Sequence, residues 1–421
     1  MIQPPTHMIG RRAMFDLRHA LLAYWSARRI RTRAQLDALR GKRLARWLRD
    51  AVPKVPFYRQ HKGERLEDLP IVDKSMLMAD FAAFNTAGVT AEQGGQAFET
   101  TRQIGDFIVG ASTGTSGNRG LFVISQAERF RWLGTILAKA LPGFWRQKHR
   151  VAVLLPLNTP LYDSANRLQR LKLRFFDLGA DWEADLCVFD PTVVIAPPKV
   201  LRQIAEGALP VSPQRVFAGA EALDDLDKQV IGAFFKQPLG QIYMATEGLL
   251  AVSCAQGSLH LCEDTMHFEL PAFGDDPNLR EVIISDFSRE VQIMARYRMN
   301  DLIRLGPPCA CGLPHRTVAQ VVGRADDCFH LPGGMITPDV MRNAVVDADR
   351  KITDYRIVQT DAATIEITIP FGCDIQAVLR AMQKVLERRC VQAEVTVSQA
   401  HILPDMSRKL RRVENRHRPH S

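Results

Sequence analysis

One stretch of the sequence combines small and hydroxyl-bearing residues in a way that suggests chemistry. Residues 110–120, GASTGTSGNRG, contain four glycines and four hydroxyl side chains. The backbone N–H groups and hydroxyls of such a loop can cradle a phosphate. The first five residues also fit the G-x-S-x-G pattern of a serine nucleophile, with Ser112 as the serine. A flexible turn is the third interpretation.

The flanking sequence discriminates among these interpretations. QIGDFIVG before the stretch and GLFVIS after it are both strand-like, and the next helix is predicted only near Gln126. A nucleophile elbow needs its serine on a turn that runs directly into a helix, so a serine hydrolase is disfavoured. A Walker loop is excluded because no lysine follows the glycines at the required spacing. An anion-binding loop and a plain hairpin remain.

Four further residues have the types and spacing of metal ligands. Cys254 and His260 are separated by five residues, and Cys309 and Cys311 follow 48 residues later. Three thiolates and one imidazole are typical of a closed tetrahedral zinc site, in which no position stays open for catalysis. The alternative is that these cysteines pack in the apolar interior.

Composition bounds the class of protein. The chain has 421 residues, 46% of them hydrophobic and 24% charged, as expected for a globular protein of two or three domains. No apolar run approaches the length of a membrane span, and the N-terminal sequence does not resemble a secretion signal. We therefore expect a cytoplasmic protein without membrane insertion, in which the eight cysteines stay reduced.

The formal net charge of +9 is concentrated near the two ends of the chain. In residues 28–49 the arginines alternate with apolar residues at helical spacing, which predicts an amphipathic helix with a solvated basic face. The sequence has no zinc-finger spacing and no aromatic RNA-binding signature, so a nucleic-acid partner is not predicted. An acidic protein partner or an anionic ligand is the alternative interpretation of this charge.

Periodicity predicts two domains of different size. Residues 1–100 are expected to form a mainly helical, basic segment, and short apolar runs alternate with helical patterns from about 105 to 300. That alternation indicates an α/β fold with a substantially parallel sheet. A smaller α+β unit begins after Gly323. We expect a large N-terminal domain at 1–325 and a small C-terminal domain at 326–421, the latter mobile if the family resemblance described below holds.

Six motifs in order carry a resemblance to a known family. The glycine stretch is followed by FAGAEALDD (217–225), YMATEG (243–248), YRMNDLIRL (297–305), GRADD (323–327) and MSRKLRR (406–412). This series resembles the adenylate-forming superfamily of acyl-CoA synthetases, peptide-synthetase adenylation domains and luciferases. The segments PIVDKSML and LHLCED resemble the phenylacetate–CoA ligase branch, close to the deazaflavin-adenylylating synthetases. The resemblance covers the chain from about residue 50 onward.

The resemblance implies a reaction and its partners. A carboxylic acid, by analogy an aryl acid, attacks the α-phosphorus of ATP and forms an acyl-adenylate and pyrophosphate. The acyl group then passes to coenzyme A or to the phosphopantetheine of a carrier protein. ATP and magnesium are the implied cofactors, and a homodimer is left open. An adenylyltransferase that stops at AMP transfer and a non-catalytic nucleotide-binding homologue are the alternatives.

The resemblance also assigns roles to residues around the nucleotide. Thr246 would contact the α-phosphate and Glu247 would bind magnesium, which prefers carboxylate and phosphate oxygens. Tyr243 would stack on the base or fill the core. The residues expected to hold the β- and γ-phosphates are Ser112, Thr113, Gly114, Thr115, Ser116 and Gly117. Those expected to line the adenine pocket are Gly219, Ala220 and Glu221.

The remaining roles concern the ribose, the hinge and the catalytic lysine. Asp301 would accept hydrogen bonds from the ribose hydroxyls, and Arg324 would reach the ribose or a phosphate. Asp326 matches the hinge about which the small domain rotates. Lys409 matches the lysine that bridges the substrate carboxylate and the α-phosphate. Members of the same branch have a C-x5-H…C-x-C zinc site, so the resemblance favours a structural zinc ion on Cys254, His260, Cys309 and Cys311.

The sequence departs from the family pattern in three motifs. Asn118-Arg119 replaces the usual Lys-Pro of the phosphate loop, and Arg119 keeps a cation there with a different reach. Met299-Asn300 replaces Thr-Gly before Asp301, and Arg408 replaces the glycine before Lys409. These departures place the local loop geometry in question while the chemical groups are kept.

Overall fold

A computed structural model describes residues 6–61, 65–112, 119–155, 170–179, 181–402 and 411–417, with side chains from residue 17 onward. The chain opens with two long helices, α1 (Thr6–Arg28) and α2 (Arg33–Asp50). A capping box starts α2, because the Thr32 hydroxyl accepts from the Gln35 N–H and the Gln35 side chain accepts from the Thr32 N–H. Short helices follow: η1 (Val52–Lys54), α3 (Pro56–Arg59), η2 (Leu66–Asp68), α4 (Lys74–Ala79), η3 (Phe81–Phe84) and α5 (Ala91–Glu99).

An eleven-stranded sheet forms the centre of the molecule, in the order β11-β12-β13-β14-β10-β9-β8-β7-β6-β4-β5. The strands from β8 to β5 in this order pair in parallel, and all other neighbours pair antiparallel. The parallel strands are β4 (His149–Val153), β5 (Leu171–Phe175), β6 (Val193–Ala196), β7 (Arg215–Gly219) and β8 (Gly240–Ala245). The antiparallel strands are β9 (Gly248–Ser253), β10 (Leu259–Leu261), β11 (His267–Glu269), β12 (Leu279–Ser285), β13 (Tyr297–Leu305) and β14 (Thr317–Arg324).

The parallel half of the sheet has helices on both faces. Alternate residues of β4 enter different cores: Val151 and Val153 pack with α1 and α6 (Gln126–Ala140), whereas Ala152 packs on the opposite face. That opposite face is covered by α7 (Trp182–Phe189), α8 (Pro198–Glu206) and α9 (Asp225–Phe235). Continuous apolar strands are expected when both faces are buried. The predicted α/β class is confirmed, although the segment EVIISDF belongs to the antiparallel half.

The described residues also form three smaller sheets, of three, two and four strands. Strands β1 (Gln103–Ile104), β2 (Phe107–Ala111) and β3 (Leu121–Ser125) form an antiparallel sheet that carries the glycine stretch between its last two strands. The C-terminal elements share one hydrophobic core around Phe329, Val345 and Ile367. They are η6 (Ala325–Asp327), β15 (Phe329–Leu331), β16 (Gly334–Ile336), α10 (Pro338–Ala348), β17 (Arg356–Gln359), β18 (Thr364–Ile369), α11 (Ile375–Arg389), β19 (Glu394–Gln399) and β20 (Val413–Asn415). A domain boundary at residue 325 stays a prediction.

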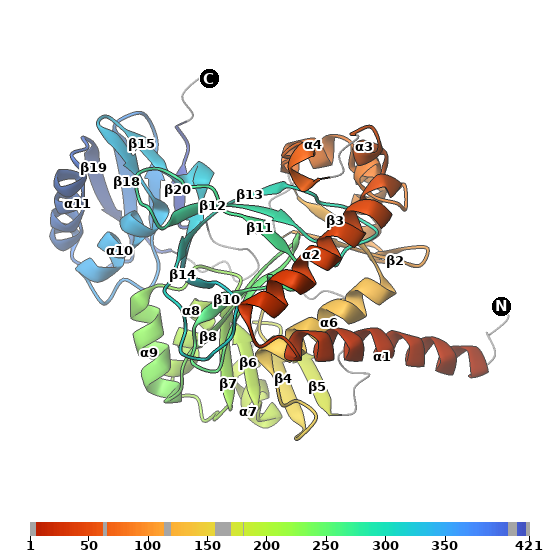
Figure 1. Ribbon diagram of the computed structural model, residues 1–421. Helices are drawn as coiled ribbons and strands as arrows, with labels where there is room; N and C mark the ends of the chain where they lie inside the picture. The colour runs from red at the N-terminus through yellow and green to blue at the C-terminus, as the bar shows by residue number, and fades with distance from the viewer. Residues whose placement is uncertain are drawn as a thin grey trace.

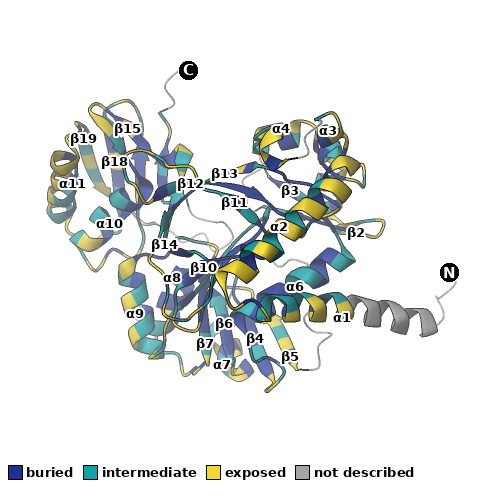
Figure 2. Ribbon diagram, in the orientation of Figure 1, coloured by how far each residue is buried: buried dark blue, intermediate teal, exposed yellow. Residues whose placement is uncertain are grey.

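The arrangement of these parts is visible in Figure 1. Helix α2 lies across the antiparallel half of the sheet, and the elements from β15 onward gather on the other side of the molecule from α3 and α4. Buried residues concentrate in the central sheet, whereas the outward side of α2 is exposed (Figure 2). Among the described residues, no helix is both long and apolar enough to cross a bilayer.

Candidate functional site

A cavity of about 1830 Å³ lies where the motifs of the sequence converge. Its wall includes a described part of every motif region: Ser112 and Gly120 from the glycine stretch, Gly219 to Leu223, Tyr243 to Gly248, Asp301, Arg324, Asp326, and Arg411 beside the C-terminal motif. Segments up to three hundred residues apart in the sequence therefore meet at one site. Thr113, Gly114, Thr115, Ser116, Gly117 and Lys409 lie outside the described residues.

The base of the glycine stretch is closed by hydrogen bonds of Ser112. Its backbone N–H donates to the carbonyl of Gly120 at 2.8 Å, and its hydroxyl accepts from the Gly120 N–H at 2.9 Å. Gly110 is required by packing, because a Cβ there would lie 2.1 Å from the ring of Phe122. The chain returns as β3, and α6 starts only at Gln126. This strand-to-strand geometry is not that of a nucleophile elbow.

The turn after β7 contains a strained residue. Ala220 has φ +67°, in the left-handed region that a non-glycine residue seldom adopts. Strain of this kind clusters at binding sites. The next residue, Glu221, has a buried carboxylate whose two oxygens accept no hydrogen bond among the described residues, with the ammonium of Lys199 3.9 Å away. Gly219, Ala220 and Glu221 all face the cavity, as a ligand pocket there requires.

Two tyrosine hydroxyls bind two carboxylates in the cavity wall, that of Glu247 just after β8 and that of Asp301 within β13. The Tyr243 hydroxyl donates to Asp301 at 2.5 Å, and the Tyr297 hydroxyl donates to Glu247 at 3.1 Å. Burial raises the pKa of the Glu247 carboxyl, since the charged form loses its hydration. Burial, reinforced by Asp301, also raises the pKa of Tyr243. The Tyr243 hydroxyl thus fixes the orientation of Asp301, and the predicted role of its ring, stacking on the base or filling the core, stays a prediction.

The residues before Asp301 and after Arg324 contact one another. Asn300 has φ +61°, and its side-chain oxygen accepts from the backbone N–H of Asp326 at 3.2 Å. Asparagine tolerates this conformation, so the replacement of the family's glycine keeps the turn. Arg324 pairs with Asp326 at 3.1 Å, and Arg411 donates to the buried carboxylate of Asp327 at 2.8 Å. The segment 324–327 is thus tied to both the main sheet and the C-terminal motif.

The four candidate metal ligands converge in a second cluster. Their ligand atoms, from Cys254, His260, Cys309 and Cys311, all lie within 4.8 Å of one another. The Nε2 of His260 is 3.3 Å from the sulfur of Cys311, while its Nδ1 is 3.1 Å from the carbonyl of His315. A second partner of this kind fixes the ring orientation of a metal-binding histidine. The donor set and its closure fit a tetrahedral zinc ion.

Comparisons with known proteins agree with this geometry. No family model matches the sequence. Phenylacetate–coenzyme A ligases from Pseudomonas putida and Thermus thermophilus are each 24% identical to it, over 81% and 86% of this chain and 84% and 87% of theirs. A solved 2-hydroxyisobutyryl-CoA ligase in the postadenylation state, bound to 2-HIB-AMP, superposes with a TM-score of 0.69 at 18% identity, covering 94% of this chain and 93% of that one. The chain is thus similar over most of its length to phenylacetate–coenzyme A ligases, and it shares the fold of the solved 2-hydroxyisobutyryl-CoA ligase.

The predicted α/β fold is confirmed, and the similarity to coenzyme A ligases agrees with the predicted enzyme class. The fold is shared more widely: an anthranilate CoA ligase with bound anthranoyl-AMP has a TM-score of 0.52, 11% identity, and covers 72% of this chain and 65% of its own. The roles assigned to individual residues, and the nearer relation to deazaflavin-adenylylating synthetases, stay predictions.

The cavity also contains residues that sequence reasoning missed. Arg289 is buried and donates to the Thr246 carbonyl at 2.9 Å, and its own carbonyl accepts from the indole of Trp47 at 2.6 Å. Lys74 lines the wall next to Gly120, where burial lowers the pKa of its ammonium. Lys74 stands in the PIVDKSML segment, which was a usable signal. The surroundings of Arg289 and Trp47 gave none, because their partners are distant in sequence.

Proposed function

We propose that the chain activates a carboxylic acid with ATP as an acyl-adenylate and transfers the acyl group to coenzyme A. The observation that carries this proposal is the convergence of the motif segments on one cavity, with Glu247 and Asp301 held by tyrosines in its wall. The similarity to phenylacetate–coenzyme A ligases supports the acceptor. The step is mainly positioning and neutralisation of phosphate charge.

Each residue in the cavity then has a task. Glu247 would hold magnesium, and its raised pKa is consistent with a buried carboxylate whose charge awaits a cation. Asp301, oriented by Tyr243, would accept from the ribose hydroxyls. Lys409 would bring the acid carboxylate to the α-phosphate. The glycine stretch, from Ser112 onward, would hold the outer phosphates, and Gly219 to Glu221 the adenine.

We propose an aryl acid as the substrate class. Several aromatic side chains line the cavity: Trp47, Phe98, Phe122, Trp132 and Phe287. Rings of this kind bind an aromatic acid by stacking and edge-to-face contacts.

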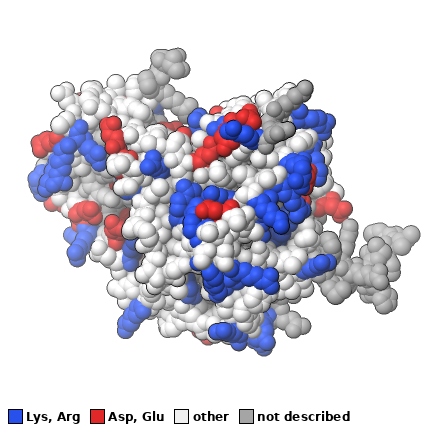
Figure 3. Space-filling view, viewed as in Figure 1, with Lys and Arg blue, Asp and Glu red and all other residues white. Residues whose placement is uncertain are grey.

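We prefer coenzyme A to a carrier protein as the acceptor because arginines of the basic helix α2 are bonded within the molecule. Basic side chains gather over α2 with acidic ones among them (Figure 3). Arg33, Arg40 and Arg43 bond to Glu263 or to the backbone of Asp264, whereas Arg46 and Arg49 point to solvent. The predicted solvated basic face is therefore wrong for Arg40 and Arg43, which are only partly exposed, and these two charges are less available to an acidic carrier.

We also propose that the cluster of Cys254, His260, Cys309 and Cys311 binds a structural zinc ion. The support is the convergence of its four ligand atoms and the contact of His260 with the His315 carbonyl. Bound there, zinc would supply a fixed tetrahedral junction between the chain after β9 and the chain before β14, and no open coordination site.

A pyrophosphate-exchange assay with a panel of aromatic and aliphatic acids tests the ligase. Exchange that depends on an acid and collapses in Lys409→Ala excludes a non-catalytic nucleotide-binding homologue. Release of AMP that requires coenzyme A separates the ligase from an adenylyltransferase that stops at AMP transfer. If no acid supports exchange in the wild-type chain, the proposal fails.

A further inference from the structure

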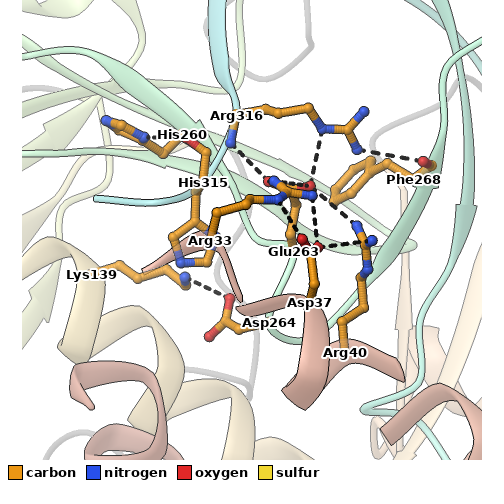
Figure 4. Close-up of polar contacts among 10 residues, drawn as sticks. All are labelled: Arg33, Asp37, Arg40, Lys139, His260, Glu263, Asp264, Phe268, His315 and Arg316. Atoms are coloured by element: carbon orange, nitrogen blue, oxygen red, sulfur yellow. Dashed lines mark hydrogen bonds and ion pairs between the residues drawn. The ribbon is translucent and has the colours of Figure 1, made fainter. Parts of the chain in front are cut away.

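The dipeptide Glu263–Asp264 is a buried acidic junction to which the proposed reaction assigns no role. The side chains of Glu263 and Asp264 are 0% and 1% exposed, which is rare for carboxylates unless they are paired. Cations from α2, α6 and the segment before β14 converge on them (Figure 4). Its position, three residues after His260, places it beside the metal cluster.

Glu263 joins two parts of the chain that are distant in sequence. Its carboxylate accepts from the backbone N–H and the guanidinium of Arg316 at 2.8 and 3.0 Å. It also accepts from Arg33 at 3.1 Å and from Arg40 at 3.4 Å. Asp37 pairs with both of these arginines at 3.0 Å, so the charges of the group are nearly balanced. Charge-assisted bonds of this type are strong when water is excluded.

Asp264 makes a second attachment of the same helix. Its carboxylate pairs with Lys139 of α6 at 2.7 Å, and its carbonyl accepts from Arg43 at 2.7 Å. Arg33, Arg40 and Arg43 are spaced by seven and three residues, which places them on one face of α2. Helix α2 is therefore docked by that face along the turn after β10.

The same junction contacts the metal cluster through the chain before β14. His260 contacts the His315 carbonyl, and the neighbouring Arg316 is the residue that bonds twice to Glu263. Strand pairing of His260 with Thr317 continues this contact. A metal ion bound to His260, Cys309 and Cys311 would fix two segments that hold Glu263 in place. One is β10, which precedes Glu263, and the other is the segment before β14, which contains Arg316.

At its other end α2 forms part of the cavity wall. Arg43 and Trp47 line the cavity, and Trp47 donates to the carbonyl of Arg289. Arg289 in turn donates to the carbonyl of Thr246. An unbroken series of contacts thus runs from His260 through Glu263 and α2 to the proposed α-phosphate site.

We propose that Glu263 is a positioning residue through which a metal ion in the cluster holds α2 against the cavity. The proposal rests on the zinc site proposed above and does not require ligase activity. It gives a metal without an open coordination site an effect on the reaction, because the ion stabilises the cavity wall from outside. Loss of the ion loosens α2 first at Arg33 and Arg40.

Hydrogen exchange of the full-length, zinc-loaded chain tests this coupling, with zinc content measured by elemental mass spectrometry. In the wild type, removal of zinc with a chelator speeds amide exchange of residues 33–50 by about tenfold, the size of a typical coupling between sites. In Glu263→Gln, exchange in α2 is already fast with zinc bound, and chelation changes it little. If the Glu263 carboxylate had a merely structural role, its loss in Glu263→Gln would instead raise exchange by the same factor with and without zinc.

The matched control is Arg49→Gln, at the exposed end of α2, where Arg49 pairs with Asp50 and not with Glu263. Its response to chelation should equal that of the wild type. If Glu263→Gln does not fold, Arg40→Gln removes one partly exposed partner of Glu263 and should show a smaller loss of coupling. The proposal is overturned if the chain binds no zinc, if chelation leaves α2 unchanged, or if Glu263→Gln responds as the wild type does. Pyrophosphate exchange, measured separately, decides the ligase proposal.

Discussion

The two ends of strand β9 carry the side chains that we propose to bind two metal ions in sites of opposite character. Glu247 precedes the strand and faces the cavity, whereas Cys254 follows it and belongs to the Cys/His cluster. Six extended residues separate these ends by about 20 Å. The cluster offers four protein ligands to one ion, but Glu247 offers a single carboxylate and leaves the other positions to phosphate oxygens and water. In this proposal, one strand separates a metal site that serves stability from one that serves chemistry.

The largest expected effect comes from removing one ligand of the Cys/His cluster. Cys311→Ser removes one of four zinc ligands, and we expect it to lower the free energy of unfolding by more than about 4 kcal/mol, because metal binding to such sites is coupled to folding. Thermal unfolding of the zinc-loaded variant and wild type measures the loss. Cys390→Ser, at an exposed cysteine outside the cluster, is the control. Equal melting temperatures for Cys311→Ser and wild type would contradict a structural metal.

A change at Glu247, at the other end of β9, should lower activity and not stability. Glu247→Gln keeps the shape of the side chain and its contact with Tyr297, but it removes the charge proposed to bind magnesium. We expect pyrophosphate exchange to fall on the order of 10²-fold, about 2.7 kcal/mol of transition-state stabilisation. The free energy of unfolding should change little or rise, since a buried charge is removed. A variant with wild-type exchange at low magnesium would remove Glu247 from the mechanism.

The fold around these sites could be predicted where the signal is local. Apolar runs such as those of β4 and β6 identified the parallel half of the sheet, and the glycine stretch was placed between two strands. The role of the arginines in α2 could not be predicted, because a helical pattern of basic residues is the same whether its partners are water or Glu263. The bond of the Tyr243 hydroxyl to Asp301 could not be predicted either, because it joins residues 58 positions apart. Contacts across the sheet leave no periodicity in the sequence.

A smaller effect is expected at the hairpin that faces the Glu247 end of β9. Gly110→Ala places a Cβ 2.1 Å from the ring of Phe122, so the ring must move or the strands must separate. Overpacking of this kind costs about 1–3 kcal/mol of stability. The double variant Gly110→Ala with Phe122→Leu should recover part of that loss in denaturant unfolding. If Gly110→Ala alone is neutral, the close packing of β2 against β3 is not as described.

The smallest effect concerns pH and again separates the two ends of β9. Burial raises the pKa of Glu247, so its proton persists to a higher pH than in a solvated glutamic acid. The protonated form stabilises the native state at low pH, and this stabilisation is lost as the pH rises through the raised value. Magnesium reverses the preference by binding the charged form, so the magnesium concentration needed for half-maximal exchange should fall as the pH rises. Tyr297→Phe deletes the hydrogen bond that favours the charged carboxylate and should move this dependence to higher pH. A magnesium requirement that is independent of pH, in both the wild type and Tyr297→Phe, would mean that the ion binds elsewhere in the cavity.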